Sequence, residues 1–579
     1  MPDIGFSPYT FTAQEPSTEP TRPTLIPFQS TFRQITEHFL RALCSAGLIL
    51  GTLFFAVSLT PSLVPRPFVM QGLLSGVALA SGYGIGVFGR WLWRYLELPV
   101  AHGRSRWVLK GVLGLICIGV AIAFLIQASE WQNSVHGLMG LPPVETDRPF
   151  SVGLIAAVVF TGLLFVARLF GLITRIVSRR LTHIVPVRLA AFVAVCFSIF
   201  VFWTIANGVF ARAVMNAFDA SFGQLDAHIE AEVDAPFNPL KTGSADSLIA
   251  WRDLGRQGRR FVGSGPARDD IAAFTREPAL DPLRVYVGLN SAETIEARAS
   301  LALAELKRVG GFERSVLVIV TPTGTGWVDP GAMNSLEYLH HGDVASVAVQ
   351  YSYLPSWLTL LAQPDYGADT AKALFRAVYD HWRELPAESR PQLYLHGLSL
   401  GALNSERSAD MWDIVGDPFH GALWSGPPYR SPTWQWVTAN RNPDSPAWLP
   451  RFRDGSVIRF TNQDTQLDDF DAPWGPLRIV YLQYASDPVS FFDPLAFLRE
   501  PAWLSGSRGP DVSPSLRWFP VVTMLQLAVD VAAADNAPIG YGHAYATEHY
   551  IDAWRAVSAP AGWTDGDIER LKATIGDLR

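Results

Sequence analysis

Five long apolar segments in the first 211 residues constrain this chain more than any other feature of its sequence. None of them contains a charged residue, and they cover residues 42–65, 67–89, 111–129, 151–167 and 189–211. A helix that crosses a lipid bilayer needs about 20 predominantly apolar residues. So many uncharged segments in succession are not expected of buried helices in a soluble core. The sequence therefore predicts an all-α transmembrane domain of about five spans over residues 41–212.

The composition of the whole chain agrees with membrane embedding. Only 17% of the 579 residues are charged, whereas soluble globular proteins carry about 25%. The formal net charge of −7 argues against a nucleic-acid partner, because domains that bind nucleic acids present basic surfaces. The three cysteines, Cys44, Cys117 and Cys196, all lie in apolar segments. We therefore expect neither a disulfide nor a thiolate metal site in the polar part of the chain, and no cofactor.

Basic residues between the apolar segments predict how the spans are oriented. The connection after the second segment carries Arg90, Arg94, Arg104, Arg106 and Lys110, and the connection after the fourth carries Arg175, Arg179, Arg180 and Arg188. The other two connections carry only Arg66 and only Arg148 as basic side chains. Connections rich in Lys and Arg stay in the cytoplasm. We therefore expect a multi-pass protein of the cytoplasmic membrane with everything after the fifth span outside the cytoplasm.

The rest of the chain divides into three parts. Residues 1–40 are rich in Pro and Thr and are expected to form a disordered tail. Residues 213–282 are interpreted as a linker or accessory segment. They contain a basic cluster of Arg252, Arg256, Arg259 and Arg260, which suits lipid headgroups, a solvated helix face or internal salt bridges. Residues 283–579 alternate between strand-like and helical patterns, which predicts an α/β domain with a mostly parallel sheet. Strands are expected at 284–289, 315–322, 344–352, 392–399, 421–426, 456–462 and 478–486.

The segment with the clearest chemistry follows the fourth of these strands. It reads Gly397-Leu398-Ser399-Leu400-Gly401, and a helical pattern begins directly after it. A Gly-x-Ser-x-Gly sequence between a strand and a helix is typical of a nucleophile elbow, in which the serine hydroxyl is exposed on a strained turn. The pattern alone also occurs in plain glycine-rich turns. Its position between strand and helix favours Ser399 as a catalytic nucleophile.

A serine nucleophile needs a base and an acid, which follow it in the chain in this kind of fold. His543 lies in a glycine-rich loop before a last helix and is predicted to be the base, whereas His420 comes too early and His549 lies inside that helix. Two aspartates end late strands. Asp487 is favoured as the acid because Pro488 stops its strand there, and Asp464, one strand earlier, remains the alternative.

An oxyanion hole needs two donors close to the nucleophile. The backbone N–H of Leu400, directly after Ser399, is expected to supply the first. The second is expected from the glycine-rich loop after the second strand, at Thr323 or Gly324, where Thr adds a hydroxyl donor. The loop lacks the lysine of a phosphate-binding loop, and its alternative role is a tight turn without chemistry.

Several stretches of the chain resemble one known family. They are "DSLIAWRDLGRQGRRFV", "RVYVGLNSAET", "TPTGTGWVDP", "LHGLSLGALNSE", "YLQYASDPVSFFDP" and "GYGHAYATEHYIDAW". Together they resemble the membrane-anchored alpha/beta-hydrolases of actinobacteria and proteobacteria, which join an N-terminal multi-span domain to a hydrolase domain. The resemblance implies a bacterial serine hydrolase with Ser399, Asp487 and His543 as its triad, and it leaves the substrate open.

These observations favour an esterase or lipase that acts on a lipid or an acyl or aminoacyl ester of the envelope at the outer face of the membrane. Tryptophans and phenylalanines gather in two late stretches, residues 427–450 and residues 491–518, and such surfaces suit either an apolar substrate or an anchor in the lipid interface. Two alternatives remain: an acyltransferase with a lipid donor, and a non-catalytic scaffold or transport-associated protein. Transport is disfavoured because the centres of the spans lack charged residues.

Overall fold

The computed structural model of the protein describes residues 43–99, 104–145, 148–210, 234–355, 358–359, 366–470 and 472–576. The expected disordered tail of residues 1–40 lies outside these ranges. All five predicted spans form helices, which are α2 (Ser45–Ser58), α3 (Phe68–Tyr95), α4 (Arg104–Leu138), α5 (Pro149–Leu181) and α6 (Val187–Trp203), followed by the π-helical turn η1 (Thr204–Phe210).

Three of these helices have the length and hydropathy needed to cross a membrane. They are α3, the part of α4 from Lys110 onward, and α5, whereas α2 and α6 are apolar but shorter. The chain thus has a membrane-associating helical domain before its α/β domain, as the sequence predicts. The expected number of five complete spans stays a prediction.

Small residues set the packing of the helical domain. A Cβ atom added at Gly76 of α3 would lie 2.6 Å from the Cβ of Val159 in α5, and one added at Gly86 would lie 2.5 Å from the carbonyl of Ala46 in α2. Two faces of α3 therefore press against two different helices. A Cβ atom added at Gly84 would have no atom within 4 Å among the described residues. The contact with α5 therefore lies nearer the N-terminus of α3, around Gly72 and Gly76.

The α/β domain is built on one sheet of seven parallel strands. The strands are β1 (Leu283–Val287), β2 (Val316–Thr321), β3 (Val344–Val349), β4 (Gln392–Leu398), β5 (Gly421–Ser425), β6 (Ile458–Thr461) and β7 (Arg478–Leu482). Their order in the sheet is β1-β3-β2-β4-β5-β7-β6. All seven predicted strands are present. The last strand of the chain, β7, lies between β5 and β6, so β6 forms the edge.

Helices cover both faces of this sheet, since every residue of β2 and β3 is buried. The helices of the domain are α8 (Gly255–Gly263), α9 (Arg268–Thr275), α10 (Ile295–Arg308), α11 (Pro330–Leu339), α13 (Tyr366–Glu384), α14 (Leu400–Glu406), α15 (Met411–Ile414), α16 (Pro432–Ala439), α17 (Pro488–Phe491), α18 (Val522–Ala532), α19 (Thr547–Ser558) and α20 (Asp565–Ile575). In one group of helices α13 packs against α10 and α14, and in another α19 packs against α11 and α20. Short 3-10 turns add η2 (Trp251–Leu254), η3 (Gly311–Glu313), η4 (Pro494–Phe497) and η5 (Ala534–Asn536).

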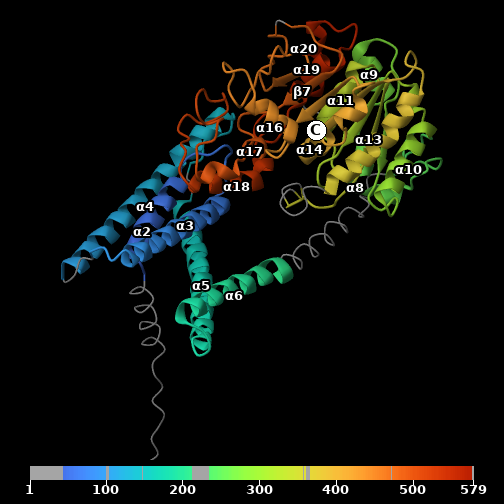
Figure 1. Cartoon of the computed structure of the whole chain (residues 1–579). Helices are drawn as coiled ribbons and strands as arrows, with labels where there is room; N and C mark the ends of the chain where they lie inside the picture. Colours follow the sequence, from blue (N-terminus) through green and yellow to red (C-terminus); the bar gives the residue numbers. More distant parts are fainter. Residues whose placement is uncertain are drawn as a thin grey trace, which may run out of the picture.

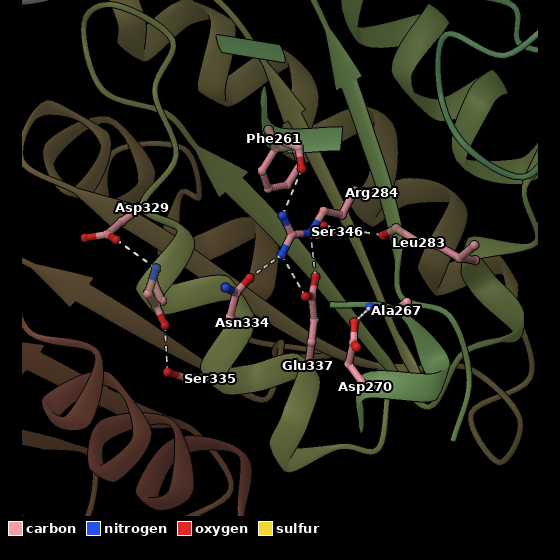
Figure 2. A network of polar contacts seen from close by, with 12 residues as sticks. Phe261, Ala267, Asp270, Leu283, Arg284, Asp329, Asn334, Ser335, Glu337 and Ser346 are labelled. Carbon is pink, nitrogen blue, oxygen red and sulfur yellow. Dashed lines mark hydrogen bonds and ion pairs between the residues drawn. The ribbon is translucent and has the colours of Figure 1, made fainter. Parts of the chain in front are cut away.

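The segment before β1 packs into the core of the α/β domain. Arg284 of β1 forms a buried ion pair with Glu337 of α11 at 2.7 Å, and it donates to the side chain of Asn334 and to the carbonyl of Phe261 in α8 (Figure 2). This network ties α8 to the sheet and to α11. Arg259 of the predicted basic cluster is also buried, so it does not face lipid.

The connection between α2 and α3 joins the helical domain to the α/β domain. Residues 59–66 are buried, and Arg66 pairs with Asp530 of α18 at 3.3 Å, with both side chains fully inaccessible to solvent. The hydroxyl of Ser62 and the N–H of Leu63 donate to the same carboxylate. Figure 1 shows α18 beside α2 and α3, against which it packs. The α2–α3 connection of the helical domain is therefore buried against the α/β domain.

We predict that Asp530→Ala strongly destabilises the protein. The change leaves the Arg66 guanidinium buried without its carboxylate, and breaking a buried ion pair in this way costs about 3–5 kcal/mol. Thermal unfolding of the detergent-purified chain should show a midpoint lower by several degrees. Asp410→Ala, which breaks the exposed pair with Lys372, serves as the matched control and should leave the midpoint unchanged. Equal midpoints for the two variants would contradict this assignment.

Candidate active site

Ser399 occupies a strained turn between β4 and α14. Its backbone has φ 58° and ψ −125°, a region that side-chain-bearing residues rarely adopt. The flanking glycines are required by close contacts: a Cβ at Gly397 would lie 2.3 Å from the backbone of Gly401, and one at Gly401 would lie 2.2 Å from the carbonyl of Thr321. Strand and helix can cross at this distance only without side chains. The strained turn between strand and helix that the sequence predicts at Ser399 is thus present, and the role of Ser399 as a nucleophile stays a prediction.

The turn is fixed to the sheet and faces a cavity. The N–H of Ser399 donates to the carbonyl of Ser425 at the end of β5 (2.9 Å). Ser399 is 4% exposed and lines a cavity of about 510 Å³ together with Leu400, His543 and Tyr545. We call this space the Ser399 cavity. A cavity of this size falls in the usual range for small-molecule sites.

His543 and Asp487 are hydrogen-bonded at this cavity. The Nδ1 atom of His543 lies 2.8 Å from Oδ2 of Asp487, whose side chain is fully buried. Asp487 is also the N-cap of α17, where its Oδ1 accepts the N–H of Val489 at 2.8 Å. The structure therefore brings Ser399, His543 and Asp487 to one place at the carboxyl edge of the sheet, from three separate parts of the chain.

Asp464, the alternative acid, lies elsewhere. It follows β6 at the edge of the sheet and is exposed. Because β7 lies between β5 and β6, the end of β6 is one strand further from the nucleophile than the end of β7. The nearby Asp468 and Asp469 are exposed as well, and Asp471 lies outside the described residues. The sheet order thus separates the two candidate acids.

The other two histidines considered from the sequence have structural partners. Nδ1 of His420 accepts the N–H of Leu393 at 3.1 Å, and Nδ1 of His549 lies 2.6 Å from the hydroxyl of Tyr484. Burial lowers the pKa of both side chains from the ordinary value for histidine. Neither belongs to the lining of the Ser399 cavity among the residues that the structure describes.

Tyr545 is a site residue that sequence reasoning missed. Its hydroxyl donates to the same Oδ2 of Asp487 that contacts His543, at 2.6 Å, and the side chain is fully buried. Burial and the adjacent carboxylate raise the pKa of Tyr545 well above its ordinary value, so the hydroxyl keeps its proton. Nothing in the sequence around "GHAY" distinguishes this tyrosine from the many others in the core.

A second set of hydrogen bonds holds the loop that carries His543. Ser486 Oγ accepts the N–H of Gly542 at 2.9 Å and donates to Asp511 Oδ2 at 2.6 Å. Gln463 Nε2 donates to the same carboxylate oxygen (2.9 Å) and to the carbonyl of Gly540 (3.1 Å). These contacts hold the loop at the backbones of Gly540 and Gly542, both of which have positive φ angles. The position of the imidazole therefore depends on residues far apart in the sequence.

The expected oxyanion donors, Leu400, Thr323 and Gly324, differ in their position relative to the Ser399 cavity. Leu400 begins α14 and lines the cavity, and so does Thr323. The N–H of Thr323, however, donates to the carbonyl of Trp327 at 2.9 Å, so the turn uses this amide. The side-chain hydroxyl of Thr323 is therefore its remaining candidate donor. Gly324 does not belong to the cavity lining among the described residues.

Within the ranges that the structure describes, no group of three or more His, Cys, Asp and Glu side chains is arranged to hold a metal ion. Ser399 and His543 line the Ser399 cavity, and the buried carboxylate of Asp487 contacts the imidazole. A hydroxyl, an imidazole and a buried carboxylate in this arrangement suit acyl-transfer chemistry.

Comparison with known proteins agrees with this fold. A sequence profile described as "Alpha/beta-hydrolase family" matches residues 283–571, and a second, described as "Alpha/beta-hydrolase family N-terminus", matches residues 59–266. No curated protein gives a significant match. Together the two profiles extend over most of the helical domain and the whole sheet.

Two solved structures show distant likeness. One is of a metagenome-derived lipolytic enzyme, 21% identical, with 24% of this chain and 53% of that chain covered and a TM-score of 0.14. The other is Trichoderma reesei cutinase in complex with a phosphonate inhibitor, 14% identical, with 42% of this chain and 88% of that chain covered and a TM-score of 0.18. This chain thus spans about half the length of the first structure, and at these TM-scores neither likeness informs on substrate. The profile matches and the sheet lead to one conclusion: the chain belongs to the alpha/beta-hydrolase family that carries its own N-terminal helical region.

Proposed function

We propose that the protein is a membrane-anchored serine hydrolase that cleaves an ester through Ser399, His543 and Asp487. The observation that carries the proposal is the strained turn at Ser399, which faces the same cavity as an imidazole oriented by a buried carboxylate. A strained backbone at a cavity is costly for the fold and is found where function requires it.

The reaction would proceed in two balanced steps. Ser399 Oγ attacks the ester carbonyl carbon while its proton passes to Nε2 of His543, since Nδ1 faces Asp487. The tetrahedral intermediate then expels the alcohol, which takes that proton and leaves an acyl-enzyme. A water molecule repeats the sequence: His543 accepts its proton, the oxygen adds to the acyl carbon, and the carboxylic acid leaves as Ser399 regains a proton.

Other residues would stabilise the charges formed in these steps. Asp487 stabilises the imidazolium, and its second donor, Tyr545, holds the carboxylate in place. The N–H of Leu400 and the hydroxyl of Thr323 are the proposed donors to the oxyanion. Donors that are already oriented toward the developing charge contribute on the order of 10²–10³ in rate for each one removed.

The substrate is proposed to be a lipid or another acyl or aminoacyl ester of the envelope. In support, Val531 of α18 and Ala534 of η5 line the Ser399 cavity, and α18 packs on α2 and α3. The cavity wall therefore lies against the domain that associates with the membrane.

The proposed location is the outer face of the cytoplasmic membrane, since the connections rich in arginine are those remote from the Arg66–Asp530 contact.

We predict that Ser399→Ala abolishes both ester hydrolysis and labelling by a fluorophosphonate. Loss of a triad member costs on the order of 10⁴–10⁶ in rate. The measurement is turnover of a p-nitrophenyl ester by the detergent-purified chain, with labelling followed on a gel. Ser389→Ala, at an exposed serine before β4, is the matched control and should retain full activity. Activity of Ser399→Ala within tenfold of the wild type would remove this serine from the mechanism.

The two aspartates give a second test. Asp487→Asn should lower turnover by about 10⁴, because the amide favours the wrong imidazole tautomer. Asp464→Asn should lower it less than about tenfold, since this side chain is exposed and lies one strand away. Both variants are measured with the same ester. A larger loss at Asp464 would mean that the acid comes from β6.

The location is tested with topology reporters. A reporter that is active only outside the cytoplasm should be active when fused after Arg579. It should also be active when inserted at residue 507, which lies in an exposed loop. A reporter at residue 183, between α5 and α6, should behave in the opposite way, because that connection is rich in arginine. Activity of the cytoplasmic reporter at the C-terminus would overturn the orientation.

A further inference from the structure

A second hollow lies beside the Ser399 cavity and has no part in the chemistry proposed above. It is a groove of about 530 Å³ formed by α16, α17, η4 and residues 499–503. We call it the aromatic groove, because five of its lining residues are aromatic: Tyr429, Trp434, Phe491, Phe492 and Trp503. Gln435, Arg441, Asp493 and Arg499 also line it, and Arg441 donates to the backbone carbonyls of Thr438 in α16 and of Ser445 after it.

The wall between the aromatic groove and the Ser399 cavity is thin. Pro428 and Val489 line the cavity, whereas the residues that follow them, Tyr429 and Ser490, line the groove. The N–H of Tyr429 donates to the carbonyl of Val489 at 3.1 Å, which joins the two strips of chain that make the wall. The two spaces are therefore neighbours across a single layer of residues.

Tyr429 connects the groove with the nucleophile elbow. Its side chain packs against Leu400 and Leu403 of α14, and its ring meets the ring of Phe492 edge-on with centroids 4.9 Å apart. Leu400 directly follows Ser399. The tyrosine that lines the groove thus touches the residue next to the nucleophile, and it is only half-buried.

Exposed apolar side chains border the groove at η4. Leu495 lines the groove and is 45% exposed, and Phe497 and Leu498 are 38% and 67% exposed. The turn η4 packs on α18, and α18 packs on α2 and α3 of the helical domain. Three exposed apolar residues so close in sequence form a small surface suited to an apolar partner. Here the neighbouring domain is the one that associates with the membrane.

We propose that the aromatic groove binds the unbranched acyl chain of a membrane lipid ester whose carbonyl carbon reaches Ser399. This inference rests on the proposed hydrolase function and specifies its substrate class. The aromatic walls offer rigid apolar area to a hydrocarbon chain, and the volume lies in the range of small-molecule sites. The lip at Leu495, Phe497 and Leu498 lets the chain leave the bilayer without crossing water. The polar part of the lipid stays at the Ser399 cavity.

The test is to fill the groove without removing a buried side chain. Ala502 lines the groove and is exposed, so Ala502→Trp adds bulk there. We compare kcat/KM for p-nitrophenyl dodecanoate and p-nitrophenyl acetate on the full chain in detergent. The wild type should prefer the dodecanoate, and the variant should lower the dodecanoate-to-acetate ratio about tenfold. A change of this size corresponds to keeping about two methylenes out of an apolar site, at roughly fourfold for each.

The ratio is internal to each preparation, so a smaller folded fraction does not change it. Ala561→Trp places the same side chain on an exposed loop between α19 and α20 and should leave the ratio within twofold of the wild type. The inference is overturned if Ala502→Trp also keeps the wild-type ratio, or if the wild type shows no preference between the two esters.

Failure of the proposed function has a different signature. In that case the wild type hydrolyses neither ester in a Ser399-dependent way. The groove is then tested by binding alone, with a dodecanoate that carries a photoactivatable diazirine. Crosslinks within residues 429–441 and 490–503 that disappear in Ala502→Trp support an acyl-chain site, and crosslinks confined to other residues overturn it.

Discussion

The structure depends on a buried ion pair between its two domains. Arg66 belongs to the helical domain and Asp530 to α18, and neither side chain is accessible to solvent. Such a pair adds little net stability, because both charges must be stripped of water before they attract each other. Either charge buried alone is far more costly, however, so the pair permits one arrangement of the domains. Ser62 and Leu63 strengthen this selectivity by donating to the same carboxylate.

This contact places the helical domain within reach of the chemistry. The residue after Asp530, Val531, lines the Ser399 cavity. Val64 of the α2–α3 connection lies next to the loop of His543. A Cβ atom added at Gly542, the residue before His543, would lie 3.2 Å from Cγ1 of Val64. The N-terminal domain is therefore more than an anchor in structural terms, since its α2–α3 connection supports both a wall of the cavity and the histidine loop.

The geometry of the candidate active site follows from the parallel sheet. All seven strands run in one direction, so their carboxyl ends meet at one edge, where loops from distant parts of the chain come together. The elbow after β4, Asp487 after β7 and the loop of His543 meet there. The aromatic groove lies next to this edge, behind Tyr429. Cavity and groove thus share a position between the sheet and the helices that associate with the membrane.

The sequence by itself determined the elements: five apolar helices, seven strands and the elbow at Ser399, because apolar runs, periodicity and glycine spacing are local properties. It also indicated His543 and Asp487 through chain order and strand ends. Only the tertiary structure decided the order of the last strands, which separates Asp464 from the site, and the hydrogen bond from Tyr545 to Asp487. It also showed that the turn uses the Thr323 amide, and that residues 59–66 are buried against α18. These features arise from contacts between segments far apart in the chain, or from the exact path of a turn, and neither leaves a periodic pattern in the sequence.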